Sequence, residues 1–135
     1  MTGLSALSGQ HVLVESDSLN RGRDYLYVGD VADALVQLTL TPHLKQRVYN
    51  VSNGVRTPLH VILERIIGHV GEVKTAEGRT NLSAEAERPV LTADRMSQET
   101  GWRAATELDE GIAATLEWLR SALPLVAPGL DGGRT

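Results

Sequence analysis

The sequence predicts a small mixed α/β domain. Short runs of β-branched and aromatic residues alternate with segments whose apolar residues recur at helical spacing, a pattern typical of folds that combine strands and helices. A length of 135 residues supplies one buried core and is too short for two. We therefore expect three or four short strands and three main helices in one domain over residues 1–123, followed by a flexible tail over 124–135.

The expected strands are short apolar runs that end at turn residues. In chain order they are residues 11–15, 24–28, 47–51 and 73–76. The polar stretch 77–86 has no regular period and is expected to be a surface loop.

The first two main helices carry apolar residues at i, i+3, i+4 and i+7. One follows Asp30, which is placed to cap it, and ends before Pro42. The other begins with Thr57 as N-cap and Pro58 as the first helical residue, and it ends at Gly71, which suits the position after a helix.

The third main helix is expected to begin at Thr106 and to end before Pro124. A short helix starting at residues 92–94 precedes it and stops at Gly101.

The composition excludes several classes of protein. Lys and Arg number 13 against 17 Asp and Glu, a net charge of −4, so the chain lacks the basic excess with which proteins bind nucleic acid or anionic membranes. It has no cysteine, which rules out disulfides, a thiolate nucleophile and cysteine-ligated zinc. No apolar run reaches the roughly 18 residues of a membrane span, and the N-terminus does not resemble a signal peptide. We expect a soluble, cytoplasmic protein.

Common nucleotide-binding and catalytic motifs are also missing. The sequence contains no G-x-G-x-x-G turn, no G-x-x-x-x-G-K-S/T loop and no G-x-S-x-G elbow. His60 and His69 lie nine residues apart and so fall on opposite faces of their helix, where one metal ion cannot bind both. A bound phosphate would therefore have to be bound by side chains and not by the backbone N–H groups of a glycine-rich loop.

Arg23 and Arg88 are the candidates for phosphate contacts. Arg23 lies where a turn meets a strand, and Arg88 follows the polar loop; a guanidinium in such a place offers two parallel hydrogen bonds to phosphate oxygens. The alternative is that both are surface arginines, each paired with a nearby carboxylate, which would be that of Asp24, Glu85 or Glu87.

Four motifs follow one another along residues 9–120. They are G-R-D-Y-L-Y-V-G-D-V-A at 22–32, V-Y-N-V-S-N-G at 48–54, T-A-D through E-T-G-W at 92–102, and L-D-E-G-I through W at 108–118. In this order they resemble the NAD-dependent epimerases/dehydratases of the extended short-chain dehydrogenase/reductase family, which act on nucleotide sugars. The resemblance covers only the C-terminal, substrate-binding part of that family.

The resemblance implies a domain like the C-terminal domain of nucleotide-sugar epimerases. It implies that Arg23 and Arg88 neutralise the diphosphate of a nucleotide sugar, and that Val14 and Glu15 lie on the strand along the nucleotide base. The family binds NAD(P), but its glycine-rich turn and its Tyr-x-x-x-Lys catalytic pair do not occur in this sequence. We therefore expect no cofactor, no metal and no catalytic residue in this chain alone.

Three hypotheses about function remain open. The chain is a substrate-binding domain or fragment of an epimerase or dehydratase, or it is one half of a split enzyme whose dinucleotide-binding domain is a separate polypeptide. In the third hypothesis it is a stand-alone interaction or dimerisation module that kept the fold and lost the ligand, which fits Glu15, Ser16 and Ser18 at positions where the family has other residues. A domain without its larger half should expose apolar surface, so we predict self-association.

Overall fold

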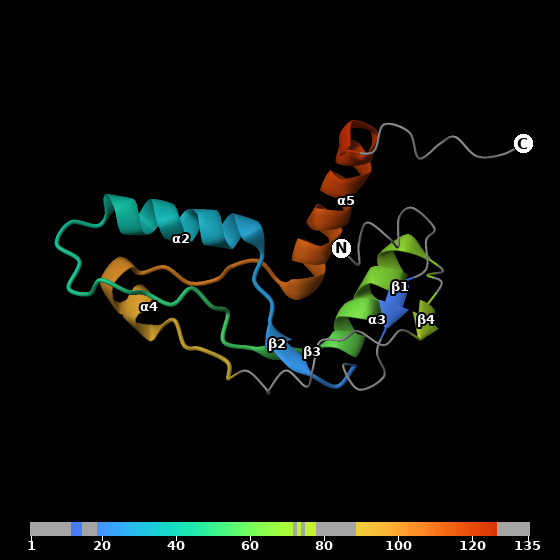
Figure 1. Ribbon diagram of the computed structural model, residues 1–135. Helices are drawn as coiled ribbons and strands as arrows, with labels where there is room; N and C mark the ends of the chain where they lie inside the picture. The colour runs from blue at the N-terminus through green and yellow to red at the C-terminus, as the bar shows by residue number, and fades with distance from the viewer. Residues whose placement is uncertain (1–11, 15–18, 72, 74, 78–88, 127–135) are drawn as a thin grey trace, which may run out of the picture.

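The computed structural model describes residues 12–14, 19–71, 73, 75–77 and 89–126 (Figure 1). These residues form four helices, which are α2 (Val28–Leu40), α3 (Leu59–Val70), α4 (Asp94–Thr100) and α5 (Leu108–Val126). They also form four strands of three residues each, which are β1 (Val12–Val14), β2 (Gly22–Asp24), β3 (Arg56–Pro58) and β4 (Thr75–Glu77). The predicted mixed α/β class is confirmed.

The strands pair as two separate ladders. β1 pairs with β4 in parallel, so that Val12 lies opposite Thr75, and β2 pairs with β3 in antiparallel orientation. The expected strands at 11–15 and 73–76 therefore correspond to β1 and β4 within two residues at each end. The strand expected at 24–28 is displaced, because the ladder ends at Asp24.

The prediction of a strand at 47–51 is wrong, since these residues form no ladder with any other described residue. Tyr49 and Val51 instead pack against the core formed by Ala34, Met96 and Trp102. β-branched and aromatic residues favour a half-buried, extended environment, but a strand also needs a neighbour for its backbone hydrogen bonds.

The hydrophobic core lies in two parts. Ala34 of α2, Met96 of α4 and Trp102 form one buried cluster, at the end of the molecule where Figure 1 shows α2 above α4. At the other end α3 and α5 pack together, where Ile62 and Leu116 are buried. The segment from β2 to the start of α2 joins the two parts (Figure 1).

Gly71 and Gly101 end α3 and α4, as the sequence predicts. Their φ angles are +83° and +76°, in the region that glycine adopts without strain. The N–H of Gly71 donates to the carbonyl of Ile67 at 2.8 Å, and that of Gly101 donates to Ser97 at 2.9 Å.

The predicted cap of α3 is wrong. Thr57 belongs to β3, and Pro58 occupies the N-cap position. The N–H groups of Leu59 and His60 donate to the carbonyls of Arg21 and Leu19 at 3.2 and 3.0 Å. A neighbouring backbone segment, which is not adjacent in sequence, thus supplies the acceptors that a capping side chain would otherwise provide.

The predictions that Asp30 caps α2 and that Thr106 begins α5 are also wrong. The two residues instead form hydrogen bonds with each other. α2 begins at Val28, which places Asp30 inside its first turn. The Asp30 carboxylate accepts the N–H of Thr106 at 3.1 Å and its hydroxyl at 3.0 Å. α5 begins at Leu108 and continues past Pro124 to Val126, so the helix extends into the predicted tail.

Candidate functional site

Arg23 lies at the centre of the antiparallel ladder of β2 and β3. It lies opposite Thr57, while Asp24 lies opposite Arg56. Since side chains alternate along a strand, Arg23 and Asp24 leave the ladder on opposite faces, and Arg23 is exposed. The carboxylate next to Arg23 in the sequence is therefore directed away from the face that Arg23 presents.

The Asp24 carboxylate is bound by the loop that precedes β3. The hydroxyl of Ser52, a buried residue, donates to it, and the N–H groups of Asn53 and Gly54 each lie 3.4 Å from one of its oxygens. The Asn53 side-chain amide also donates to the Tyr25 carbonyl at 3.0 Å. These bonds fix the strand that carries Arg23 relative to its partner strand.

Arg56 crosses β2 at Gly22. A Cβ atom placed on Gly22 would lie 2.5 Å from Cγ of Arg56 and 2.6 Å from its Nε, so the Arg56 stem packs directly over the glycine backbone. Arg56 thus brings a second guanidinium to the ladder that carries Arg23. The sequence analysis missed Arg56, because the pairing of β2 with β3 joins segments that no short-range pattern connects.

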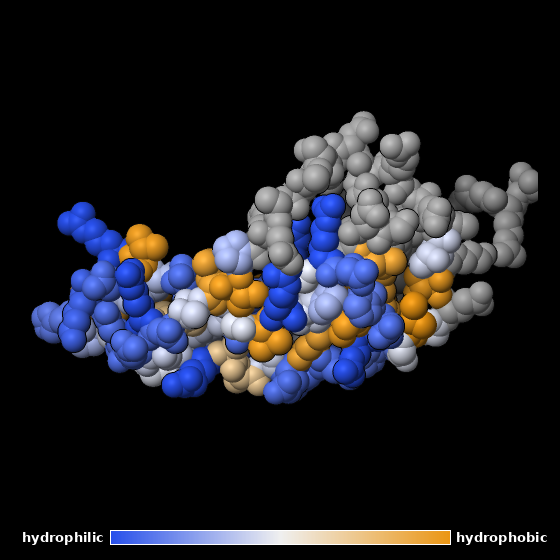
Figure 2. Space-filling model, turned by 90° about the horizontal axis from the view of Figure 1, so that it is seen from below, coloured by the Kyte–Doolittle hydropathy of each residue, from blue (hydrophilic) through white to orange (hydrophobic). Residues whose placement is uncertain are grey.

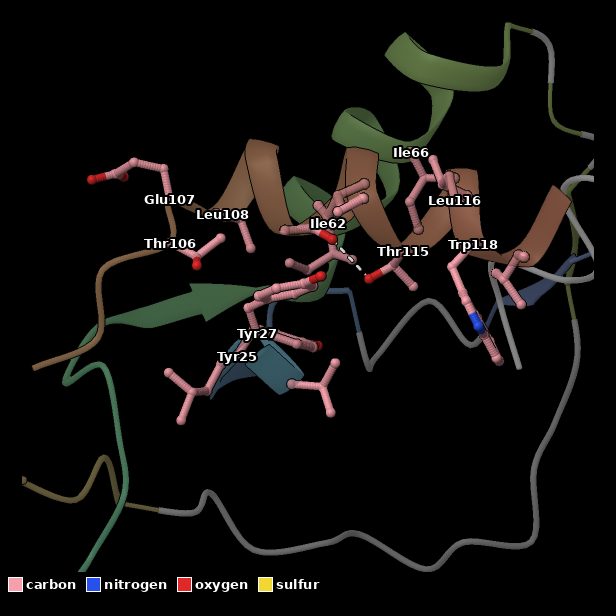
Figure 3. Close-up of a pocket in the computed structure, with 16 residues that line it drawn as sticks. Tyr25, Tyr27, Ile62, Ile66, Thr106, Glu107, Leu108, Thr115, Leu116 and Trp118 are labelled. Carbon is pink, nitrogen blue, oxygen red and sulfur yellow. Dashed lines mark hydrogen bonds between the residues drawn. The ribbon is translucent and has the colours of Figure 1, made fainter. Parts of the chain in front are cut away.

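A pocket of about 750 Å³ lies between residues 25–28, α3 and α5 (Figure 3). Its lining is mostly apolar and includes Ile62 and Ile66 from α3 and Leu116 from α5. Figure 3 shows Glu107 and Trp118 toward opposite ends of the pocket. A mostly apolar concavity of this volume is within the size range of small-molecule sites.

Tyr27 is packed in the pocket wall between two glycines. A Cβ on Gly29 would lie 2.7 Å from Cε1 of Tyr27, and a Cβ on Gly111 would lie 3.3 Å from its Cβ. Gly111 therefore allows α5 to approach the segment that follows β2. Both glycines belong to the sequence motifs over residues 22–32 and 108–118, and both serve the packing of the same aromatic ring.

Tyr25 connects the pocket to Arg23. Burial raises the pKa of the Tyr25 phenol, and the positive charge of Arg23 acts in the opposite direction. Tyr25 follows Arg23 by two residues in the chain and lines the pocket, so Arg23 belongs to the segment that leads into the pocket wall.

The other predicted site residues do not join Arg23 in the described part of the chain. Val14 ends β1, in the separate ladder with β4 beside α3 (Figure 1). Glu15 and Arg88 lie outside the described residues, so their roles stay predictions.

The histidines of α3 have partners in the fold. Nδ1 of His60 lies 3.1 Å from the Leu19 carbonyl, and Nε2 of His69 lies 3.3 Å from the Asp109 carboxylate. Among the residues that the structure covers, no three His, Asp or Glu side chains gather as metal ligands do. Likewise, none of the described helices is long and apolar enough to cross a membrane.

Comparison with known proteins relates this chain to enzymes of nucleotide-sugar metabolism. No family model matches the chain. A UDP-glucose 4-epimerase of Mycolicibacterium smegmatis is 34% identical over 99 residues, which are 73% of this chain and 31% of that protein. A dTDP-glucose 4,6-dehydratase of Shigella flexneri is 29% identical over 124 residues, which are 85% of this chain and 34% of that protein. The chain thus spans about a third of the length of these curated relatives.

Solved structures share the fold. The UDP-glucose 4-epimerase of Thermus thermophilus, solved in complex with NAD, has a TM-score of 0.74 and 28% identity, covering 90% of this chain and 39% of that chain. The UDP-glucose 4-epimerase of Thermotoga maritima, solved with UDP-glucose, has a TM-score of 0.75 at 23% identity, with 90% and 38% covered. This chain matches the C-terminal part of the extended short-chain dehydrogenase/reductase epimerases and dehydratases.

The family resemblance drawn from the four motifs is confirmed by these matches. The first motif of this epimerase/dehydratase part contains Gly22, Asp24, Gly29 and Asp30, and each makes a packing or hydrogen-bonding contact within the fold. Arg23 is an exposed member of the motif and lies two residues before Tyr25, which lines the pocket.

Proposed function

We propose that this chain is the substrate-binding part of an NAD-dependent nucleotide-sugar epimerase or dehydratase, with Arg23 binding the diphosphate of the nucleotide sugar. The observation that carries the proposal is the position of Arg23, which is exposed on a ladder that Asp24 and Ser52 fix and lies two residues before Tyr25, a residue that lines the pocket of about 750 Å³. The relatives named above support the ligand class, since one was solved with UDP-glucose.

The electrostatics favour an anion at this place. Guanidinium groups form paired, charge-assisted hydrogen bonds with phosphate oxygens. Arg23 and Arg56 lie on one short ladder, and Arg21 immediately precedes β2, in a chain whose net charge is −4. Arg56 lies opposite Asp24 and so leaves the ladder on the Asp24 face, which makes Arg23 the guanidinium on the other face that suits a diphosphate. The family resemblance adds Arg88 at the diphosphate, and Val14 and Glu15 along the base, to this proposal; Val14 belongs to the separate ladder of β1 and β4.

The reaction itself would require the rest of the enzyme. No tyrosine in the sequence has a lysine four residues later, so the proposed chain binds substrate, and a dinucleotide-binding unit carries NAD(P) and the catalytic pair. This unit is either continuous with the chain or a separate polypeptide. We place the assembled protein in the cytoplasm.

Calorimetry tests the proposal. UDP, dTDP and UDP-glucose are titrated into the chain and into the Arg23→Ala variant, with Arg103→Ala as a matched control at another exposed arginine. Loss of a charge-assisted pair at about 1.5–3 kcal/mol predicts at least a tenfold weaker Kd for Arg23→Ala and an unchanged Kd for Arg103→Ala. Absence of heat from all three ligands with the unmodified chain contradicts the proposal.

The exposed apolar residues favour a second candidate, an interaction or dimerisation module. Nine large apolar side chains are exposed among the described residues, whereas six apolar residues are buried there. In this case the chain binds none of the three nucleotides but self-associates, which sedimentation at increasing concentration would detect.

A further inference from the structure

Asn53 and Gly54 form the one Asn-Gly pair in the sequence. They lie in the loop that leads into β3, where Gly54 is exposed at a φ of +77° and Asn53 is partly buried. Figure 1 places β2, β3 and the chain that leads into β3 on the lower side of the molecule, and Figure 2 views this side, where hydrophilic side chains are interspersed with apolar ones. Water therefore reaches the loop.

An Asn-Gly pair can modify itself without an enzyme. The backbone nitrogen of the glycine attacks Cγ of the asparagine, so that an N–Cγ bond forms and the Cγ–Nδ2 bond breaks. Ammonia leaves with the proton that the backbone nitrogen gives up, and water then opens the cyclic imide at either carbonyl to yield aspartate or isoaspartate. Glycine favours the ring closure because it has no Cβ to hinder the attacking nitrogen. The reaction needs water and no other reactant.

Hydrogen bonds hold both reacting groups of this pair. The attacking nitrogen is that of Gly54, whose N–H donates to the Ser52 hydroxyl at 3.0 Å. The leaving amide of Asn53 donates to the Tyr25 carbonyl at 3.0 Å, and Oδ1 of the same side chain accepts the N–H of Val55 at 2.6 Å. Ring closure removes the Gly54 proton and releases the Asn53 amide nitrogen, so the bonds that hold these two groups have to break first.

Ser52 connects the loop to the rest of the fold. It is buried, and its hydroxyl contacts the Asp24 carboxylate and, at 2.6 Å, the Leu91 carbonyl. An opening that frees the Gly54 nitrogen therefore disturbs a buried contact. Such an opening is a local and infrequent event in a folded protein, and the reaction at Asn53 should be correspondingly slow.

The product of the reaction does not fit the same loop. A carboxylate at position 53 has no N–H to donate to the Tyr25 carbonyl, and the carbonyl oxygen would face a negative charge. The Asp24 carboxylate lies close by, since it accepts the backbone N–H of residue 53 at 3.4 Å, and like charges repel. The modified loop thus cannot re-form its bonds, and β2, which carries Arg23, loses this attachment.

We propose that Asn53 is a site of spontaneous deamidation, which the hydrogen bonds of the Ser52 loop keep slow and which makes a transient opening of this loop permanent. The proposal goes beyond the proposed function and depends on no bound nucleotide sugar.

Mass spectrometry of proteolytic fragments tests the proposal. The chain is incubated at mildly alkaline pH with and without denaturing urea, and the rate of conversion is measured at Asn53 and at Asn50. Asn50 is the internal control, because it is exposed and is followed by Val51, whose branched Cβ hinders ring closure. Asn53 should convert at least about tenfold faster in urea than in the folded chain, while Asn50 converts slowly in both. Equal rates at Asn53 in the two conditions, or slow conversion in urea, overturn the proposal.

Ser52→Ala tests the hydrogen bonds directly. In the folded variant, Asn53 should convert about fivefold faster or more than in the unmodified chain. Ser97→Ala is the matched control, because the Ser97 hydroxyl donates to a carbonyl of its own helix, and it should leave the rate unchanged. Circular dichroism reports that each variant is folded. An unchanged rate in folded Ser52→Ala overturns the proposal, and where this variant does not fold, the comparison with urea decides.

Asn53→Asp reproduces the charge of the product and tests its effect on the loop. The urea midpoint should fall relative to the unmodified chain, whereas Asn50→Asp, the same change at an exposed position, should leave the midpoint where it is. Equal midpoints for Asn53→Asp and the unmodified chain would show that the loop accepts the product, and the permanent opening would be refuted.

Discussion

Replacing Asp30 should lower the free energy of unfolding by about 3 kcal/mol. Asp30 is 5% exposed, and its carboxylate accepts both the N–H and the hydroxyl of Thr106. Hydrogen bonds to a charged group contribute about 1.5–3 kcal/mol each, and a buried donor left without an acceptor costs about 1–3 kcal/mol. Because the two hydrogen bonds that Asp30→Ala removes end on one carboxylate, we expect a loss of about 3 kcal/mol and not the sum of two separate losses. A loss of this size is a large part of the free energy of unfolding of a typical domain, which is about 5–15 kcal/mol.

Urea unfolding followed by tryptophan fluorescence measures the effect, since Trp102 is buried in the core that α2 covers. Asp33→Ala is the matched control, because Asp33 is an exposed aspartate on the same helix and should change the free energy by less than about 0.5 kcal/mol. In a double-mutant cycle with Thr106→Val, the coupling energy should reach at least about 1 kcal/mol. Additive effects of Asp30 and Thr106, or equal losses in the two aspartate variants, would refute the reasoning.

Two further predictions concern packing and pH. Gly29→Ala places a methyl group 2.7 Å from the Tyr27 ring and should lower the free energy of unfolding by about 1–3 kcal/mol. Gly68→Ala is the control, because a Cβ at this position of α3 has nothing within 4 Å, and it should raise the free energy of unfolding by about 0.5–1 kcal/mol. Urea midpoints that shift in the same direction for both variants contradict this prediction. The hydrogen bond from the Tyr49 hydroxyl lowers the pKa of the Glu99 carboxyl below its ordinary value of 4.5. The contribution of this bond to the free energy of unfolding is therefore complete above pH 4.5 and is lost as the pH falls through the lowered pKa. Tyr49→Phe should therefore weaken the fall in unfolding free energy between about pH 5 and pH 3, and parallel pH curves for the two proteins would disprove it.

The helices could be predicted because their signals are local. Apolar spacing of three and four residues marks α2, α3 and α5, and a glycine after the last helical residue marks the ends of α3 and α4. The start of α3 could not be predicted in the same way. Its first N–H groups bind carbonyls of Leu19 and Arg21, about 40 positions earlier, and no side chain near Thr57 signals that contact.

The ladders and the site depend on contacts over long separations. Asp30 has the chemistry of a helix cap, and its actual partner, Thr106, is 76 residues away. Arg56 shares a ladder with Arg23 only because three-residue strands pair across the chain, and strands this short carry too little alternation to specify a partner. Arg23 was found from its motif, whereas the pocket beside it required the packing of α3 against α5.

The first motif predicts the fold more strongly than it predicts the ligand. Gly22, Asp24, Gly29 and Asp30 each make contacts within the protein, so a chain that had lost its ligand would still need all four. Arg23 differs in exposure, because its side chain lies at the surface, two residues before Tyr25, which lines the pocket. Arg23→Ala should therefore change the free energy of unfolding by less than about 1 kcal/mol while removing nucleotide binding. A large loss of stability with no change in binding would assign Arg23 to the fold, like its neighbours, and would favour the interaction module over the substrate-binding part.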